Sequence, residues 1–390
     1  MAKASPQGSP APDVTALGEA LRARREELGL TQARLASLAG IAAAQTVSEI
    51  EKGRREVKAH ELVRMSRALH TDVDVLLGLS ASPVEARVLW RRGSNPEDRT
   101  RDVQLLERAR RYAQLEQWCG EPAAQSLPNL QFDPRAATWA SVASLAEQMR
   151  RLLDLGSIPA AALQRTLEDC YGVKIFTEQL QGDQAGACVR SEFGAAVLLN
   201  STDAPWRRNF SLAHELFHLV TWDAVDAAWS RSARVENVEP EWYARLEKLA
   251  NHFASHLLLP AEAVLSRVNA QAQEGKLTFH RVATVACDFE VSAQALLYRL
   301  CDLRALERKD VKMVLADEDF RRVSREVMRP RRHKARPWYP GRYFKLAARA
   351  YQRGVVGKSV VATYLEVPYA EVETFDLGEP HGSEAALSLG

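Results

Sequence analysis

The chain has few cysteines and no long apolar run, and these absences exclude several classes of protein. Five of its 390 residues are cysteines and none form a CxxC pair, so neither a disulfide framework nor a cysteine zinc site is predicted. No apolar run is long enough to span a bilayer, and no charged-then-apolar secretion signal stands at the start. We therefore expect a cytoplasmic protein with no membrane partner.

Excess charge of either sign is also lacking. The chain has 52 Lys and Arg against 50 Asp and Glu, which predicts no global attraction to membrane or nucleic acid. A composition of 46% hydrophobic and 26% charged residues is ordinary for a soluble globular protein, and the length suffices for two or three domains. Function must therefore be sought in local motifs.

The most informative motif is HELFH at positions 214–218. About 3.6 residues per turn place His214 and His218 on one helical face, where both imidazoles can close on one metal ion. Glu215 then faces the open position of the metal, the arrangement typical of zinc-dependent peptidases. The same five residues also occur by chance in ordinary helices. Apolar residues at helical spacing between 206 and 222 favour the metal site, because they place the motif in a buried helix.

A third protein ligand is expected on a later helix that packs across the first. Residues 240–259 are predicted to form that helix, which contains Glu247. The same helix carries a rival pair, His252 and His256, rotated roughly 140° to 180° from Glu247 at about 100° per residue. No glutamate follows His252 directly, so this pair could bind metal but has no base in the usual position. We interpret both histidines as partly exposed or structural.

Two stretches of sequence resemble a known family of metallopeptidases. RRNFSLAHELFH at 207–218 resembles the active helix of the ImmA/IrrE family, and EKLANHFA at 247–254, with LLLP at 257–260, is similar to its second motif. Two motifs in order are more specific than HExxH alone. Phe217 stands where the family usually has glycine before the second histidine.

This resemblance implies a zinc site and a general base. The Zn²⁺ cofactor would be held by His214, His218 and Glu247, and Glu215 would act as the base. Strands predicted at 173–176 and 195–200, with a Gly-containing connection, would line a cleft by pairing with an extended peptide. The alternative is that these strands merely cover a helix.

The amino-terminal part shows several short helical periods separated by glycine or capping residues. Two short helices joined by such a turn form a helix-turn-helix, whose second helix lies in the major groove of DNA. The segments 17–22, 29–32 and 47–54 resemble the XRE/Cro class of DNA-binding domains.

That second resemblance implies a set of DNA contacts. They are Gln32 to a phosphate, Gln45, Thr46, Ser48 and Glu49 to base edges, and Lys52, Arg54 and Arg55 to the backbone. Residues 1–80 carry eleven Lys and Arg against ten Asp and Glu, which is weak electrostatics for a DNA-binding domain. We therefore expect the protein to bind a double-stranded operator as a homodimer, which doubles the phosphate contacts. The alternative to DNA binding is that this segment is a small helical protein-interaction domain.

Five segments are predicted along the chain, and the fold class is mainly α with a small β-sheet. They are a disordered start at 1–12, the helix-turn-helix domain at 13–80, a helical connector and linker at 81–138, the peptidase domain at 139–310, and a basic segment with a helical appendage at 311–390. The connector includes a long helix at 98–118 and a flexible part at 122–134. Residues 321–345 hold ten Lys or Arg and one acidic residue, typical of a nucleic-acid or acidic-partner patch or of a solvated loop.

Further helices are predicted at 142–155, 158–171, 344–353 and 358–365.

Two functions fit these predictions. In the first, a DNA-binding transcription regulator carries a zinc-dependent endopeptidase that cleaves a repressor or antitoxin-like protein in a stress, mobile-element or defence response. In the second, the regulator is not proteolytic, and its zincin-like domain senses a ligand or docks a partner. The intact base Glu215 favours the first, because a purely structural fold does not need it.

Overall fold

The computed structural model describes residues 14–69, 71, 73–78, 88–90, 98–130, 132–181, 184–224, 240–273, 276–329 and 338–377. The start predicted to be disordered, at 1–12, lies outside these ranges, and so does 330–337 of the basic segment. The chain divides into two compact units, Met1–Arg87 with Gly93–Arg110 and Val88–Arg92 with Arg111–Gly390. None of the helices in these ranges is long and apolar enough to cross a membrane.

The first unit is helical. Its elements are α1 (Val14–Glu27), α2 (Gln32–Leu38), α3 (Ala44–Glu51), α4 (Ala59–Ala68), α5 (Val73–Leu76) and the first part of α6 (Asp98–Trp118). Leu21, Leu35 and Val47 are wholly buried in its core. The side chain of Thr31 accepts a hydrogen bond from the Arg34 amide and so caps the start of α2.

A close approach and a buried ion pair hold α1 against α3. A Cβ on Gly18 would lie 2.6 Å from the Ile50 carbonyl oxygen, so only glycine fits there. The guanidinium of Arg25 donates to both carboxylate oxygens of Glu51, at 2.6 Å and 3.0 Å. The amide of Gln32 donates to the same carboxylate at 2.8 Å. The Glu51 side chain is 1% exposed, so its charge depends on these donors.

The second unit contains a four-stranded mixed sheet in the order β1-β3-β4-β2. The strands are β1 (Leu89–Trp90), β2 (Lys174–Glu178), β3 (Gly186–Ser191) and β4 (Gly194–Asn200). β2 runs parallel to β4, and β3 runs antiparallel to both β4 and β1. The strands β2 and β4 match the predicted ones. The connection expected between them instead contains β3, whose small residues give no strand periodicity in the sequence.

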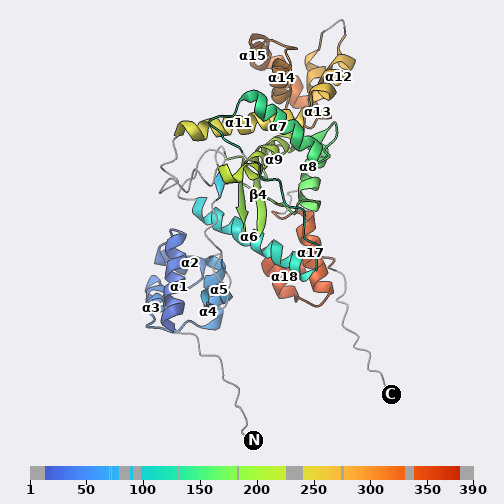
Figure 1. The fold of residues 1–390 in the computed structure, drawn as a ribbon. Coiled ribbons are helices and arrows are strands. Elements are labelled where there is room, and N and C mark those ends of the chain that lie inside the picture. Colours follow the sequence, from blue (N-terminus) through green and yellow to red (C-terminus); the bar gives the residue numbers. More distant parts are fainter. Residues whose placement is uncertain are drawn as a thin grey trace, which may run out of the picture. The chain divides into compact units, whose positions relative to one another are not determined.

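Helices enclose this sheet and extend from it. They are the rest of α6, α7 (Trp139–Leu152), α8 (Pro159–Asp169), α9 (Pro205–Val220), α11 (Pro240–Leu258), α12 (Ala261–Gln271), α13 (Phe279–Asp288), α14 (Ala293–Asp302), α15 (Arg308–Ala316), α16 (Glu318–Val327), α17 (Gly341–Gln352), α18 (Lys358–Leu365) and α19 (Tyr369–Val372). Helix α9 packs on β3 and β4, and α11 packs on α9 and α7 (Figure 1). The fold is therefore mainly helical with a small sheet, as predicted.

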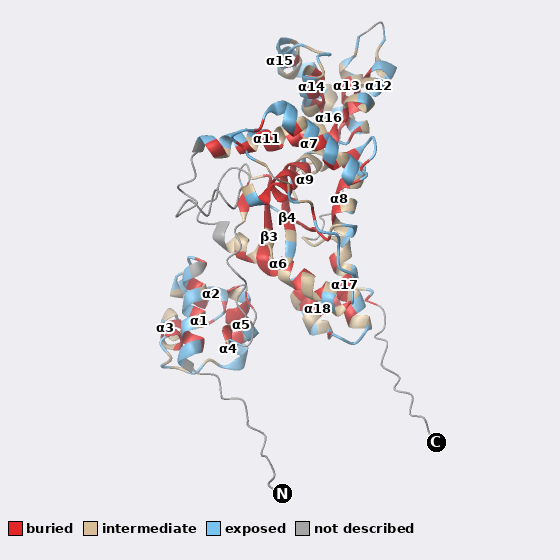
Figure 2. Cartoon of the chain, in the orientation of Figure 1, coloured by how far each residue is buried: buried red, intermediate tan, exposed pale blue. Residues whose placement is uncertain are grey.

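The centre of this unit is its most buried part. Every residue of α9 from Ser211 to Val220 is buried, and Figure 2 shows α9 and the adjoining strands mostly in the colour of buried residues. The segment predicted to be a flexible linker is tied to this centre. Its Leu130 amide donates to the Val220 carbonyl at 2.7 Å, and Leu127 is buried. Helix α9 is thus fixed on several sides.

Candidate metal centre

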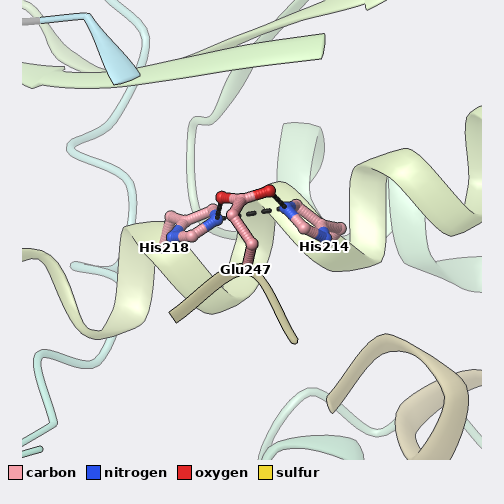
Figure 3. A group of neighbouring side chains, drawn as sticks. All are labelled: His214, His218 and Glu247. Atoms are coloured by element: carbon pink, nitrogen blue, oxygen red, sulfur yellow. Dashed lines mark hydrogen bonds and ion pairs between the residues drawn. The ribbon is translucent and has the colours of Figure 1, made fainter. Parts of the chain in front are cut away.

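Two helices bring three metal-binding side chains together, as Figure 3 shows. His214 and His218 project from α9, and the carboxylate of Glu247 on α11 lies across both imidazoles. The Nε2 atoms of the histidines are 3.1 Å apart. Glu247 Oε2 is 3.4 Å from His214 Nε2, and Glu247 Oε1 is 3.2 Å from His218 Nε2. The three residues predicted as ligands therefore converge.

These separations fit a tetrahedral zinc site. Ligand atoms at about 2.0–2.2 Å from a tetrahedral Zn²⁺ lie about 3.3–3.5 Å from one another. The observed separations of 3.1–3.4 Å are close to that spacing. Two imidazoles and one carboxylate also form a donor set that leaves a fourth position open, as catalytic zinc sites require.

Burial makes the charge of the cluster costly without a cation. His214 is 0% and His218 1% exposed, and the Glu247 side chain is 16% exposed. Burial alone would raise the pKa of Glu247, but the adjoining imidazoles of His214 and His218 together outweigh it and hold this pKa well below its ordinary value. The carboxylate is therefore charged, and it faces two imidazole nitrogens across which a cation fits.

Asn251 orients one of the imidazoles. Its Oδ1 lies 3.1 Å from His214 Nδ1. Because Nε2 of the same ring faces Glu247 and His218, Nδ1 carries the proton and donates to Asn251, which leaves the Nε2 lone pair for a metal. Asn251 was not among the residues predicted to form the site. The signal was its position one helical turn after Glu247.

Glu215 lies between the metal cluster and the sheet. It is 0% exposed. Burial and, second, the nearby Glu215 carboxylate raise the pKa of the Cys188 thiol on β3 well above its ordinary value. A Cβ on Gly186 would lie 3.1 Å from Glu215 Oε1 and 3.0 Å from the Leu198 oxygen. The glycine at the start of β3 therefore lets the carboxylate lie directly beside the strand.

Phe217 fills the position where the family usually has glycine. Its ring is 0% exposed and makes an edge contact with Phe132 at 5.2 Å and a tilted contact with Phe253 at 5.4 Å between ring centroids. Such aromatic pairs stabilise a core beyond simple burial. The larger side chain is therefore accommodated by an aromatic cluster with Phe132 and Phe253.

Two parts of the chain match models of known families. Residues 168–301 match the model of the IrrE N-terminal-like domain, a peptidase family, and residues 21–76 match a helix-turn-helix model. The chain joins a helix-turn-helix domain to an IrrE-like domain. The matched ranges contain α2, α3 and all four residues His214, Glu215, His218 and Glu247.

Other comparisons add little. A transcriptional regulator from Mycobacterium tuberculosis is similar over 48% of this chain and 51% of that one, with 17% identity and a TM-score of 0.30. The chain thus spans about half of that regulator. Comparison with curated proteins gives no match.

A second histidine cluster of the IrrE-like domain is built differently. His252, His256 and Asp302 also bring possible ligand atoms within 4.8 Å of one another. However, the Arg299 guanidinium lies 2.8 Å from His256 Nε2 and is fixed by a 2.9 Å bond to the Leu259 carbonyl. His252 Nε2 lies 3.1 Å from the Trp139 carbonyl. A fixed cation already beside His256 opposes a second one, so the structure favours the His214 cluster. Both histidines are partly exposed, as predicted.

The residues expected to contact DNA lie on and around α3 of the helix-turn-helix domain. Gln45 is exposed and donates to Glu49 at 3.5 Å, and Thr46 is partly exposed. Lys52 and Arg54 are exposed after the end of α3. Three residues differ from this pattern. Ser48 is 9% exposed, the amide of Gln32 bonds Glu51 as described above, and the guanidinium of Arg55 donates to Glu61 at 3.0 Å.

Proposed function

We propose that the chain is a DNA-binding transcription regulator whose IrrE-like domain is a zinc-dependent endopeptidase. The proposed substrate is a partner repressor or antitoxin-like protein whose cleavage switches genes in a stress, mobile-element or defence response. The single observation that carries the proposal is the meeting of His214, His218 and Glu247 beside the buried carboxylate of Glu215. A site that only stabilised a fold would need the three ligands but not the fourth residue.

The four side chains divide the chemistry between them. His214 and His218 with Glu247 would hold the metal, and a Zn²⁺ bound there supplies Lewis acidity and lowers the pKa of water to about 7. Glu215 accepts the proton that the attacking water loses and later donates it to the leaving amine. Its complete burial keeps bulk water from competing for that proton. Asn251 holds His214 in the tautomer that binds metal.

The sheet supplies a place for the substrate backbone. β3 lies beside Glu215 through Gly186, and it pairs with β4 on one side and with the two residues of β1 on the other. An extended peptide that pairs with β3 would bring a peptide bond close to the base while leaving most side chains unread. This mode of binding suits a protein substrate with an exposed or unfolded segment.

The helix-turn-helix domain would bring this activity to an operator in the cytoplasm. The exposed side of α3, with Gln45, Thr46 and Glu49, would face base edges, and Lys52 and Arg54 would meet the backbone. Gln32 would reach a phosphate only by releasing Glu51, and Ser48 would have to turn outward. The small net charge of the domain provides few contacts to DNA phosphates, and a homodimer would double them.

The substitution Glu215→Gln tests the enzymatic proposal. It keeps the shape of the side chain but removes the base, so we expect full zinc content and DNA binding and no processing of a coexpressed repressor from a neighbouring gene. Intact mass of that repressor is the readout, and His252→Ala, which lies outside the cluster, is the matched control. Processing by Glu215→Gln at the wild-type rate would leave the non-proteolytic regulator as the better account.

A further inference from the structure

The outer edge of β3 is already occupied by another part of the chain. Leu89 and Trp90 form β1, which pairs antiparallel with β3 so that Leu89 lies opposite Cys188 and Trp90 opposite Ala187. Leu89 and Trp90 are each 2% exposed. Both belong to the same compact unit as the metal centre, although in the sequence they precede α9 by more than a hundred residues. The edge proposed for the substrate is therefore covered by an internal strand.

The internal strand also contacts the helix that carries the third metal ligand. The hydroxyl of Tyr243 donates a hydrogen bond to the Trp90 carbonyl. Tyr243 stands one turn before Glu247 on α11, on the same helical face. On β3, Gly186 lies directly beside the Glu215 carboxylate, two residues before Cys188, which pairs with Leu89. The two-residue strand thus pairs with the strand beside the base and is hydrogen-bonded to the helix of the third ligand.

The contacts of β1 are of the kind that a peptide bound by strand addition would make. It is extended, it pairs through its backbone with the strand beside the base, and one of its carbonyls is held by a hydroxyl from the ligand helix. Backbone pairing of this kind holds a peptide without depending on its full sequence. A short strand on a sheet edge can also serve only to block aggregation. The hydroxyl contact from α11 is what a mere edge cover would not require.

We propose that Leu89 and Trp90 form an internal strand that occupies the substrate edge of β3, and that a peptide substrate must displace it. Tyr243 would be the residue that positions the carbonyl of whichever strand is bound. This inference rests on the proposed peptidase function and adds its regulation: the enzyme is held closed by its own connector. The substrate class is an extended peptide with apolar side chains at two adjacent positions.

The closed state does not disturb the metal ligands. His214, His218 and Glu247 lie within ligand distance of one another while β1 is in place. The block therefore acts on substrate entry and leaves metal binding intact. A tethered strand competes at an effective concentration on the order of millimolar, so a free peptide at micromolar concentration would be largely excluded.

Binding of a peptide that copies β1 tests the proposal without requiring hydrolysis. The probe is a fluorescent synthetic peptide with the sequence ARVLWRR of residues 86–92, and its binding to the full-length protein is measured by anisotropy. In the variant Leu89→Gly with Trp90→Gly the internal strand is weakened, and we expect at least tenfold tighter binding than to wild type. Adding Tyr243→Phe should reverse a severalfold part of this gain. Equal binding to wild type and variant overturns the proposal.

A covalent lock covers the case in which the double glycine variant does not fold. Leu89→Cys places a thiol opposite Cys188, and directly opposed residues of an antiparallel pair lie within the range a disulfide can bridge. We expect the oxidised variant to lose peptide binding and the reduced variant to regain it, whereas Leu89→Cys with Cys188→Ala should be insensitive to oxidant. A disulfide that forms and leaves peptide binding unchanged also overturns the proposal.

Neither test depends on turnover. Peptide binding that behaves as described, together with an inactive enzyme, would refute the peptidase function and keep the internal strand. An active peptidase in which these substitutions leave peptide binding unchanged would keep the peptidase function and refute the internal strand.

Discussion

Asn251 gives the sharpest test of how the metal centre is built. Its Oδ1 accepts from His214 Nδ1 at 3.1 Å, whereas Nδ1 of the buried His218 has no hydrogen-bond partner among the described residues. Asn251→Ala removes the oxygen that fixes the His214 ring and its tautomer. Loss of such an outer partner weakens metal binding about 10–100-fold, which corresponds to about 1.4–2.7 kcal/mol.

Competition with a chromophoric chelator measures this change directly. Asn251→Asp keeps an acceptor oxygen at the same position, so we expect its zinc affinity to remain within a few-fold of wild type. His252→Ala, on the other side of α11, should leave the affinity unchanged. If Asn251→Ala bound zinc as tightly as wild type, the orientation of His214 would not depend on this contact and the reasoning would be wrong.

Three further predictions concern stability. Glu51→Ala leaves the buried Arg25 guanidinium without its carboxylate, so we expect a loss of about 3–5 kcal/mol, seen as faster hydrogen exchange in α1 and α3; unchanged exchange would contradict it. Burial raises the pKa of Glu168 to about 7 from 4.5, so the folded protein holds this proton more tightly than the unfolded chain does. The free energy of unfolding is therefore highest below pH 4.5 and falls as the pH rises through 7. Glu168→Gln should therefore stabilise the protein at pH 8 by on the order of 1–3 kcal/mol and give no such gain at pH 4, which melting curves at both pH values would check. Phe217→Ala removes the contact with Phe132 and should cost about 3–5 kcal/mol with zinc content unchanged; an unaltered melting temperature would count against the aromatic cluster.

Local periodicity explains how much of this fold could be predicted. Helix α9 was expected at 206–222 and runs Pro205–Val220, and α6 was expected at 98–118 and runs Asp98–Trp118. Apolar spacing and capping residues determine such elements within a few turns of chain. The convergence of Glu247 with the two histidines came from a resemblance between motifs, because spacing within one helix says nothing about which helix packs across it.

The missed features all depend on contacts between distant parts of the chain. A strand of two residues such as Leu89–Trp90 has no period to detect, and its existence depends on β3. The role of Asn251 depends on how α11 crosses α9, which the sequence does not specify. The pairing of Arg299 with His256, which sets the rival cluster apart, joins residues of two helices. Tertiary packing decided each of these cases.

Metal content tests the central claim most directly. Native mass spectrometry of the full-length protein should show one Zn²⁺ per chain for wild type and for Glu215→Gln, and none for His214→Ala with His218→Ala. A wild-type chain that binds no divalent metal would contradict the account. So would a double variant that keeps its zinc, because the ion would then be bound elsewhere; among the described residues, His252, His256 and Asp302 form the other candidate group.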